Sequence, residues 1–170
     1  MLAIPASTGS DDALLVSLYG EDHRLCSLPP QAPAMVLSCE RDIDLIELEA
    51  LCDAVGWSRR PLRRVKRALQ HSLLRVGLWR HDPRLPRLVG FARCTGDGVV
   101  EATVWDVAVH PLYQGAGLGR QLMAYLVQQL DAMGVERVTL YADPGVVSFY
   151  ASQGWELEPA QRRCAFWYAT

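Results

Sequence analysis

The segment Val104–Arg120 combines an extended apolar run, a glycine-rich turn and the start of a helix. The run Val104–Val109 is rich in β-branched and aromatic residues, and Pro111 ends it. Three glycines follow between Gly115 and Gly119, and leucines then recur at helical spacing. A glycine-rich turn at a helix start leaves backbone N–H groups pointing outward at the positive end of the helix dipole. The segment therefore predicts an anion site, for which phosphate is the usual ligand.

Two common phosphate-binding motifs do not fit this turn. A P-loop requires GxxxxGK[ST], but Gly119 is followed by Arg120 and Gln121. The dinucleotide fingerprint GxGxxG is half matched by Gly115 and Gly117, and Arg120 then occupies the position of the third glycine. The turn is therefore neither a P-loop nor a good dinucleotide motif.

The pattern that fits is [QR]xxGxG, matched by Gln114, Gly117 and Gly119 after the run DVAVHPLYQ. This pattern resembles the acetyl-coenzyme A loop of the GCN5-related N-acetyltransferases (GNAT). Taken alone, the turn is equally compatible with a plain glycine-rich connection. A second segment, VSFYASQGWE around Phe149 and Tyr150, resembles the other signature of that family. A predicted helix and strand separate the two, so residues 34–170 are identified as a member of the family.

The resemblance implies acetyl-coenzyme A as the co-substrate and no metal. The loop amides would hold the pyrophosphate, and the preceding strand would bind pantetheine. Backbone N–H groups near Val107 and Val109 would polarise the thioester carbonyl, a contact worth about 3 kcal/mol in comparable sites. The residues expected to bind the co-substrate are Val107, Ala108, Val109, Gln114, Gly115, Ala116, Gly117, Leu118, Gly119, Arg120, Val146 and Tyr150.

The resemblance also assigns the catalytic groups. Tyr150 matches the family position of the general acid, which protonates the departing thiolate; the alternative is a core tyrosine beside Phe149. Asp106 is the acid within the strand, and an acid there costs stability unless it is paired or functional. We expect Asp106 to receive the amine proton, and the alternative is a buried ion pair with an arginine. Glu101, just before the strand, is the reserve candidate.

In this family the first helices and the loop between them set the choice of acceptor. The two signatures look closest to plastid and cyanobacterial members resembling serotonin N-acetyltransferase, which implies an arylalkylamine such as serotonin or tryptamine. Trp57 and Trp105 can stack on an indole ring, although they are equally good core residues. Acetylation of protein lysines, N-terminal amines or polyamines is the alternative activity. A non-catalytic acetyl-coenzyme A sensor of the same fold is the alternative from another class.

The fold class expected is α/β (α+β), with a mixed and mostly antiparallel sheet of about seven strands and about four helices. The sheet should splay between its fourth and fifth strands, Ala102–Val109 and Val138–Tyr141. Residues 1–33 are expected to form an N-terminal extension that adds at most one short edge strand, within Leu14–Tyr19. Asp42 is expected to cap the first helix, and Trp155–Leu157 to form a final hairpin with Ala165–Tyr168.

Composition and charge exclude several other classes of protein. A net charge of −2 over 170 residues does not indicate a nucleic-acid binder, and no apolar run approaches the ~18 residues of a membrane span. No secretory or transit peptide is evident, and five widely spaced cysteines without CxxC predict a reducing cytoplasm. The sequence is compatible with a homodimer and does not decide the oligomeric state. Eleven of the seventeen cations lie between Arg59 and Arg93, either as a solvated face or as a docking patch for an anion.

Overall fold

The computed structural model describes residues 14–16, 35–81 and 87–159. The chain forms two compact units, residues 1–140 and residues 141–170. No helix of the described part is long and apolar enough to cross a membrane. The first unit contains the sheet and the helices α1, α2 and α3. The second contains the second signature segment, around Phe149 and Tyr150.

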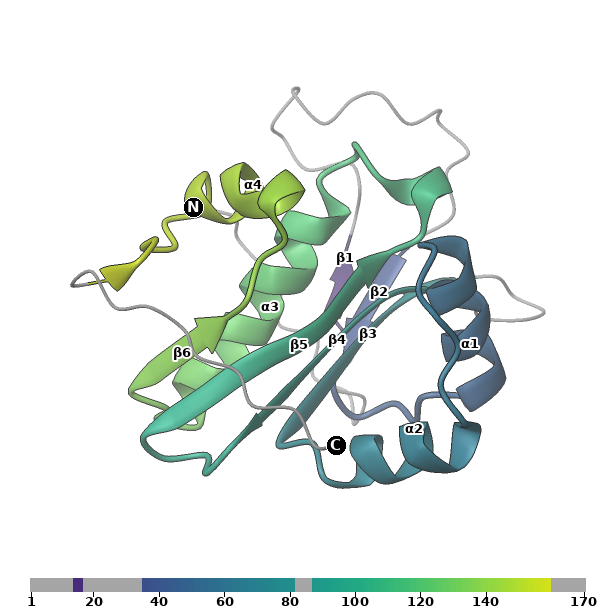
Figure 1. The fold of residues 1–170 in the computed structure, drawn as a ribbon, viewed down its shortest axis with the longest axis horizontal. Coiled ribbons are helices and arrows are strands. Elements are labelled where there is room, and N and C mark those ends of the chain that lie inside the picture. Colours follow the sequence, from purple (N-terminus) through teal and green to yellow (C-terminus); the bar gives the residue numbers. More distant parts are fainter. Residues whose placement is uncertain (1–13, 17–34, 82–86, 160–170) are drawn as a thin grey trace. The chain divides into compact units, whose positions relative to one another are not determined.

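One sheet of six strands forms the centre of the first unit, in the order β1-β2-β3-β4-β5-β6 (Figure 1). All neighbours pair antiparallel except β5 and β6, which are parallel. The strands are β1 (Leu14–Val16), β2 (Met35–Ser38), β3 (Leu74–Arg80), β4 (Arg87–Gly96), β5 (Glu101–Val109) and β6 (Arg137–Leu140). The mixed, mostly antiparallel sheet is therefore confirmed, and β1 is the short edge strand expected near the N-terminus.

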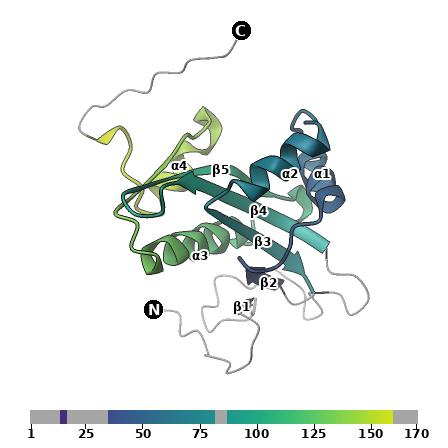
Figure 2. The ribbon, with the colours of Figure 1, turned by 90° about the horizontal axis from the view of Figure 1, so that it is seen from below.

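Helices cover both faces of this sheet (Figure 2). Helices α1 (Leu45–Ala54) and α2 (Leu62–Gln70) lie on one face, and α3 (Leu118–Ala132) lies on the other. The expectation that Asp42 caps α1 is wrong. Asp44 is the cap, because its carboxylate accepts hydrogen bonds from the backbone N–H groups of Ile46 and Glu47.

Apolar side chains hold the helices on the sheet. On α3, Leu122, Leu126 and Leu130 are fully buried, as their helical spacing predicts. On the other face, a buried cluster joins α1, α2 and three strands, and consists of Leu48, Leu51, Leu69, Trp79, Leu88, Phe91 and Ala108. This packing fixes β4 and β5, the two strands from which the candidate site is built.

The second unit begins with a 3-10 turn, η3 (Pro144–Val146), and a short helix, α4 (Val147–Ala151). The predicted strand Trp155–Leu157 is wrong, since this segment has no strand conformation. Gly154 and Glu158 both have left-handed φ, +86° and +48°, so the chain turns on either side of the segment. The other predicted arm, Ala165–Tyr168, lies outside the described residues.

Candidate active site

A β-bulge interrupts β5 near its middle. Two of its residues, Asp106 and Val107, lie opposite the single residue Ala92 of β4, because the register shifts between Phe91 and Arg93. Asp106 has a φ of +53°, a left-handed conformation that costs an ordinary L-residue about 1–2 kcal/mol. Bulges of this kind re-aim side chains and commonly lie next to active sites. The bulge therefore decides where the Asp106 carboxylate points.

Beyond the bulge, β5 extends past its parallel neighbour. The pairing with β6 covers Glu101–Val104 and ends where Val104 lies opposite Leu140, whereas β5 continues to Val109. The N–H of His110 donates to the carbonyl of Val89 on β4 at 2.8 Å, so alternation directs the N–H of Val109 toward the opposite edge. The part of β5 beyond Val104 thus has an edge that β6 does not cover, where the sequence predicts the splay.

The glycine-rich loop is tied back to the end of β5. A 3-10 turn, η2 (Pro111–Tyr113), follows the strand, and the Nδ1 atom of His110 accepts from the N–H of Leu112 at 3.2 Å. The side-chain amide of Gln114 then donates to the carbonyl of Val109 at 2.8 Å. Gln114 therefore joins the loop to the strand edge that β6 leaves uncovered.

The same loop presents backbone donors at the start of α3. Gly115 and Gly117 both have a φ of +79°, a conformation that glycine adopts without strain. Gly117 is the N-cap residue of α3, and no side chain caps this end of the helix. The first amides of the helix, those of Leu118 and Gly119, lie at the positive end of a 15-residue helix, ahead of the first intrahelical bond, in which the Gln121 N–H donates to the Gly117 carbonyl. This geometry fits the phosphate site predicted from the sequence.

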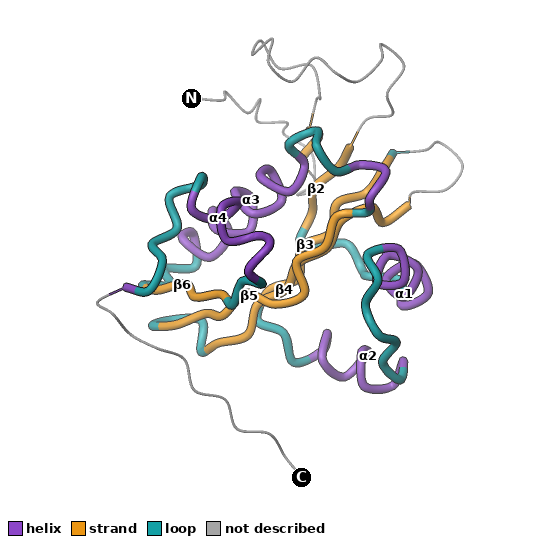
Figure 3. The backbone as a smooth tube through the Cα atoms, turned by 45° about the horizontal axis from the view of Figure 1, so that its top comes forward, coloured by secondary structure: helices purple, strands orange, loops and turns teal. Residues whose placement is uncertain are grey.

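A cavity of about 90 Å³ lies between β4, β5 and the two helices α1 and α2. One water molecule needs about 10–15 Å³ on the same measure, so the cavity admits several waters or a small organic group. Apolar side chains from the sheet and both helices form much of its wall: Leu45, Leu48, Leu62, Val65, Leu69 and Phe91. Trp57, from the connection between α1 and α2 that Figure 3 shows as a loop, also lines it.

Asp106 contributes its carboxylate to this cavity, where two arginines hold it. The Nε atom of Arg93 donates to Oδ2 at 2.5 Å, and an Nη atom of Arg60 donates to Oδ1 at 3.2 Å. The Arg93 and Asp106 side chains are 14% and 18% exposed, whereas that of Arg60 is 64% exposed. The ion pair considered as the alternative role of Asp106 is therefore present, and it joins three separate segments of the chain.

Three other predicted residues of the first unit, Trp105, Ala108 and Glu101, do not line the cavity. Trp105 is not among the lining residues although it lies opposite one of them, Arg93, in the register of β4 and β5. Its indole donates to Thr95 Oγ1 at 2.8 Å. Ala108 is buried in the core cluster. Glu101 is at the opposite end of β5 from the loop and forms an exposed ion pair with Arg137.

Tyr150 belongs to the second unit and packs among aromatic rings. Its ring contacts those of Phe149 and Trp155 edge to face, with centroids 5.0 Å and 6.1 Å apart. Burial, and in second place the carboxylate of Asp143, raise the pKa of Tyr150 above its usual value. The phenol therefore stays protonated at neutral pH. Val146 lies in the same unit and is exposed.

The cysteine of the cavity, Cys52, is not suited to act as a nucleophile. Cys52 lines the cavity, and burial, followed by the negative charge of Asp106, raises the pKa of its thiol. A neutral thiol is a poor nucleophile, so the residue does not suit an acyl-enzyme route. Among the described residues there is also no cluster of three or more histidine, cysteine or acidic side chains that could hold a metal.

Sequence reasoning did not identify Arg60 and Arg93 as the partners of Asp106. Both lie in the basic region, but Arg60 precedes Asp106 by 46 residues and Arg93 precedes it by 13. The position of Arg93 on the strand preceding β5 was the available signal, because consecutive strands of a meander usually pair. No local pattern pointed to Arg60.

Comparison with known proteins agrees with this geometry. The model of the acetyltransferase (GNAT) family matches residues 43–155. An uncharacterized ycf52-like N-acetyltransferase of Prochlorococcus marinus is 59% identical over 162 residues, which are 95% of this chain and 89% of that protein. The chloroplastic serotonin N-acetyltransferase 2 of Oryza sativa subsp. japonica is 43% identical over 129 residues, which are 74% of this chain and 63% of that protein.

A solved structure extends the likeness to three dimensions. A GNAT-family acetyltransferase from Streptococcus pneumoniae superposes with a TM-score of 0.66 at 26% identity, covering 80% of this chain and 98% of the other. The two chains thus share their overall fold over most of their length.

Proposed function

Because the chain belongs to the acetyltransferase (GNAT) family, we propose that it transfers acetyl from acetyl-coenzyme A directly to the primary amine of an arylalkylamine, such as serotonin or tryptamine. The observation that carries the acceptor proposal is the cavity between the sheet and the helices α1 and α2. It combines apolar walls and the indole of Trp57 with the carboxylate of Asp106 at the sheet. An aromatic ring and an amine on a short chain are complementary to such a cavity.

Acetyl-coenzyme A is supported as the donor by the loop and the strand edge. The uncapped first turn of α3, together with the positive φ of Gly115 and Gly117, would hold the pyrophosphate. The edge of β5 beyond Val104, which β6 does not cover, would pair with the amides of pantetheine. The N–H of Val109, on that edge, would donate to the carbonyl oxygen of the thioester.

In the proposed reaction the amine nitrogen forms the new bond to the acetyl carbon, and the bond from that carbon to sulfur breaks. An acceptor that binds as its ammonium form first gives one proton to Asp106, directly or through water, and attacks as the neutral amine. The nitrogen loses its second proton to water as the amide forms. Tyr150 gives its phenolic proton to the departing thiolate, and its raised pKa keeps that proton on the phenol at neutral pH before the transfer. The products are an amide and free coenzyme A, so the thiol released measures turnover.

The experiment is a release assay for coenzyme A with four acceptors: serotonin, tryptamine, spermidine and a lysine-containing peptide. We expect kcat/KM to be highest for the two arylalkylamines. Release with the peptide or spermidine alone would replace the arylalkylamine proposal with one of the other acceptors. Tight binding of acetyl-coenzyme A without release in the presence of any amine would instead identify a sensor.

The Tyr150→Phe variant tests the acid in the same assay. Loss of the phenolic proton should lower kcat roughly 10²–10⁴-fold while leaving the affinity for acetyl-coenzyme A intact. Because Tyr150 is packed against Phe149 and Trp155, phenylalanine preserves the ring contacts and isolates the hydroxyl. A variant with full activity at every pH would remove Tyr150 from the mechanism.

A further inference from the structure

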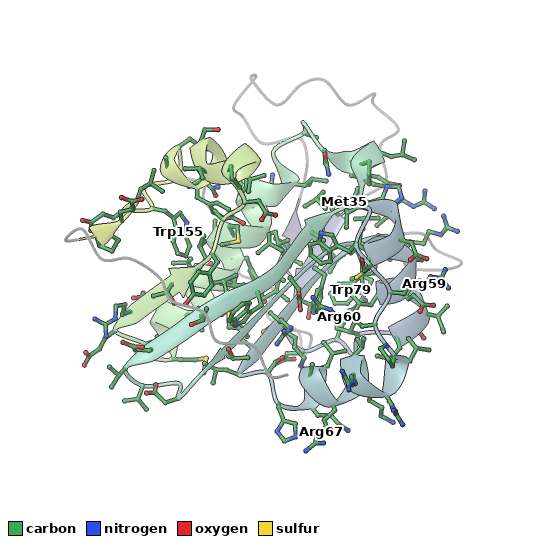
Figure 4. All side chains as sticks on the ribbon, in the orientation of Figure 1. Met35, Arg59, Arg60, Arg67, Trp79 and Trp155 are labelled. Atoms are coloured by element: carbon green, nitrogen blue, oxygen red, sulfur yellow. The ribbon has the colours of Figure 1, made fainter. Side chains whose placement is uncertain are left out.

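The two arginines that hold Asp106 differ in how firmly they are placed. Arg93 belongs to β4, is 14% exposed and donates at 2.5 Å. Arg60 belongs to the connection between α1 and α2, is 64% exposed and reaches the other carboxylate oxygen at 3.2 Å. Figure 4 shows Arg60 between the sheet and these helices, whereas Arg59 and Arg67 lie at their outer side.

Arg60 therefore places a cation in the lining of the cavity, on the carboxylate proposed to take the proton of the acceptor amine. We propose that the Arg60 guanidinium occupies the position of the acceptor's ammonium group at Asp106 Oδ1, and that a binding acceptor displaces it. The inference rests on the proposed function, including an arylalkylamine such as tryptamine as the acceptor. It makes Arg60 a positioning residue that competes with the substrate.

Exposure and geometry identify Arg60 as the cation that leaves. An exposed ion pair contributes little net stability, because water solvates both partners well once they separate. Removing one partner of a largely buried pair instead leaves an uncompensated charge. Arg60 can turn into solvent from a loop, while Arg93 is fixed by its strand. Displacement thus keeps Arg93 on Oδ2 and opens Oδ1.

Three acids line the cavity, and the one that accepts a hydrogen bond from Arg60 is Asp106. Asp53 also lines the cavity, but Arg59 donates to it through two nitrogens, at 2.6 Å and 3.1 Å. Glu49 lines the cavity as well, and Arg64 contributes a further cation. Asp106 is accordingly the acid for which Arg60 and an incoming ammonium group would compete.

A consequence is selectivity for cationic acceptors. An alcohol or a thiol brings no charge to replace that of Arg60, so it would leave Asp106 paired and Oδ1 occupied. An amine that is protonated in solution carries the charge required for the exchange. The ammonium group that displaces Arg60 would then lie within hydrogen-bonding distance of the carboxylate proposed to take its proton.

The test compares Arg60→Gln with Arg63→Gln, which removes an equal charge from an exposed site on α2 that does not line the cavity. The dissociation constant of tryptamine is measured by calorimetry in the full chain. We expect Arg60→Gln to bind tryptamine roughly twofold to fivefold more tightly than wild type, the range of an exposed ion pair. Arg63→Gln should bind tryptamine with the wild-type dissociation constant. Arg60→Lys retains a competing cation, so its dissociation constant should lie closer to wild type than that of Arg60→Gln.

A second readout follows the guanidinium itself. In protein labelled with ¹⁵N-arginine, tryptamine should shift the Nε signal of Arg60, assigned through Arg60→Gln, more than that of Arg93. Unchanged or weaker tryptamine binding in Arg60→Gln would overturn the proposal, as would absence of binding to both proteins. Tighter binding without acetyl transfer would leave the role of Arg60 intact and refute the arylalkylamine function.

Discussion

Replacing Asp106 with asparagine tests the ion pair at the centre of the site. Asparagine keeps the size of the side chain and tolerates the φ of +53°, so the change removes mainly the charge. Removing one partner of a buried ion pair costs about 3–5 kcal/mol. The Arg93 and Asp106 side chains keep 14% and 18% exposure, and the amide oxygen can still accept from Arg93. We therefore expect the free energy of unfolding to fall by about 2–3 kcal/mol.

For a domain of this size, the expected loss corresponds to a decrease in Tm of about 4–12 °C. Urea denaturation followed by tryptophan fluorescence measures it directly. Arg93→Met provides the second side of a double-mutant cycle, because methionine replaces the arginine stem with an uncharged one. The double variant should be less destabilised than the sum of the single ones, by about 1–3 kcal/mol, since neither charge is then left unpaired.

Two results would refute this reasoning. One is an Asp106→Asn protein whose unfolding free energy lies within about 0.5 kcal/mol of wild type. The other is additivity of the two single variants within that same margin. Asp106→Gly separates the effect of the lost charge from the effect of backbone strain on stability. Glycine lacks the carboxylate but adopts the left-handed conformation without strain. This variant should be less destabilised than an alanine variant at that position.

Three further predictions concern the loop, the acid and a buried thiol. Gly117→Ala should weaken acetyl-coenzyme A binding about fivefold to thirtyfold in calorimetry, because holding an alanine in the left-handed conformation of the loop costs about 1–2 kcal/mol. Gly134→Ala, with a φ of +80° at the far end of α3, should bind like wild type, and equal loss in both variants would contradict a role for the loop. Because burial and Asp143 raise the pKa of Tyr150 from its usual 10.0, the alkaline decline of kcat should lie above pH 10, and Asp143→Asn should move it to lower pH. A decline that does not move would show that another group limits the rate. Burial raises the pKa of Cys94 to about 12, so iodoacetamide at pH 8 should leave this thiol unmodified in the folded protein, as mass spectrometry can check; rapid modification would show that β4 opens.

The sequence by itself determined most of the secondary structure and the glycine-rich turn before α3, because both depend on local patterns, while the fold class followed from the resemblance of two motifs to the family. Alternating and helical apolar spacing placed most strands and helices to within a few residues. The conformation of Gly117 and the start of α3 follow from a glycine-rich turn before a periodic helix. Local reasoning failed at the cap of α1, where two aspartates, Asp42 and Asp44, compete within one turn. It also failed at Trp155–Leu157, where glycine and glutamate reverse the chain.

Only the tertiary structure decided what surrounds Asp106. The bulge turns its carboxylate toward the cavity, and no residue type in the run of β5 signals a left-handed aspartate. In the sequence, the region Arg59–Arg93 is one basic stretch, yet in the structure its arginines have different partners. Arg59 pairs with Asp53, while Arg60 and Arg93 converge on Asp106 from a loop and a strand. Such convergence depends on packing between distant segments, and a linear pattern does not record which charges packing brings together.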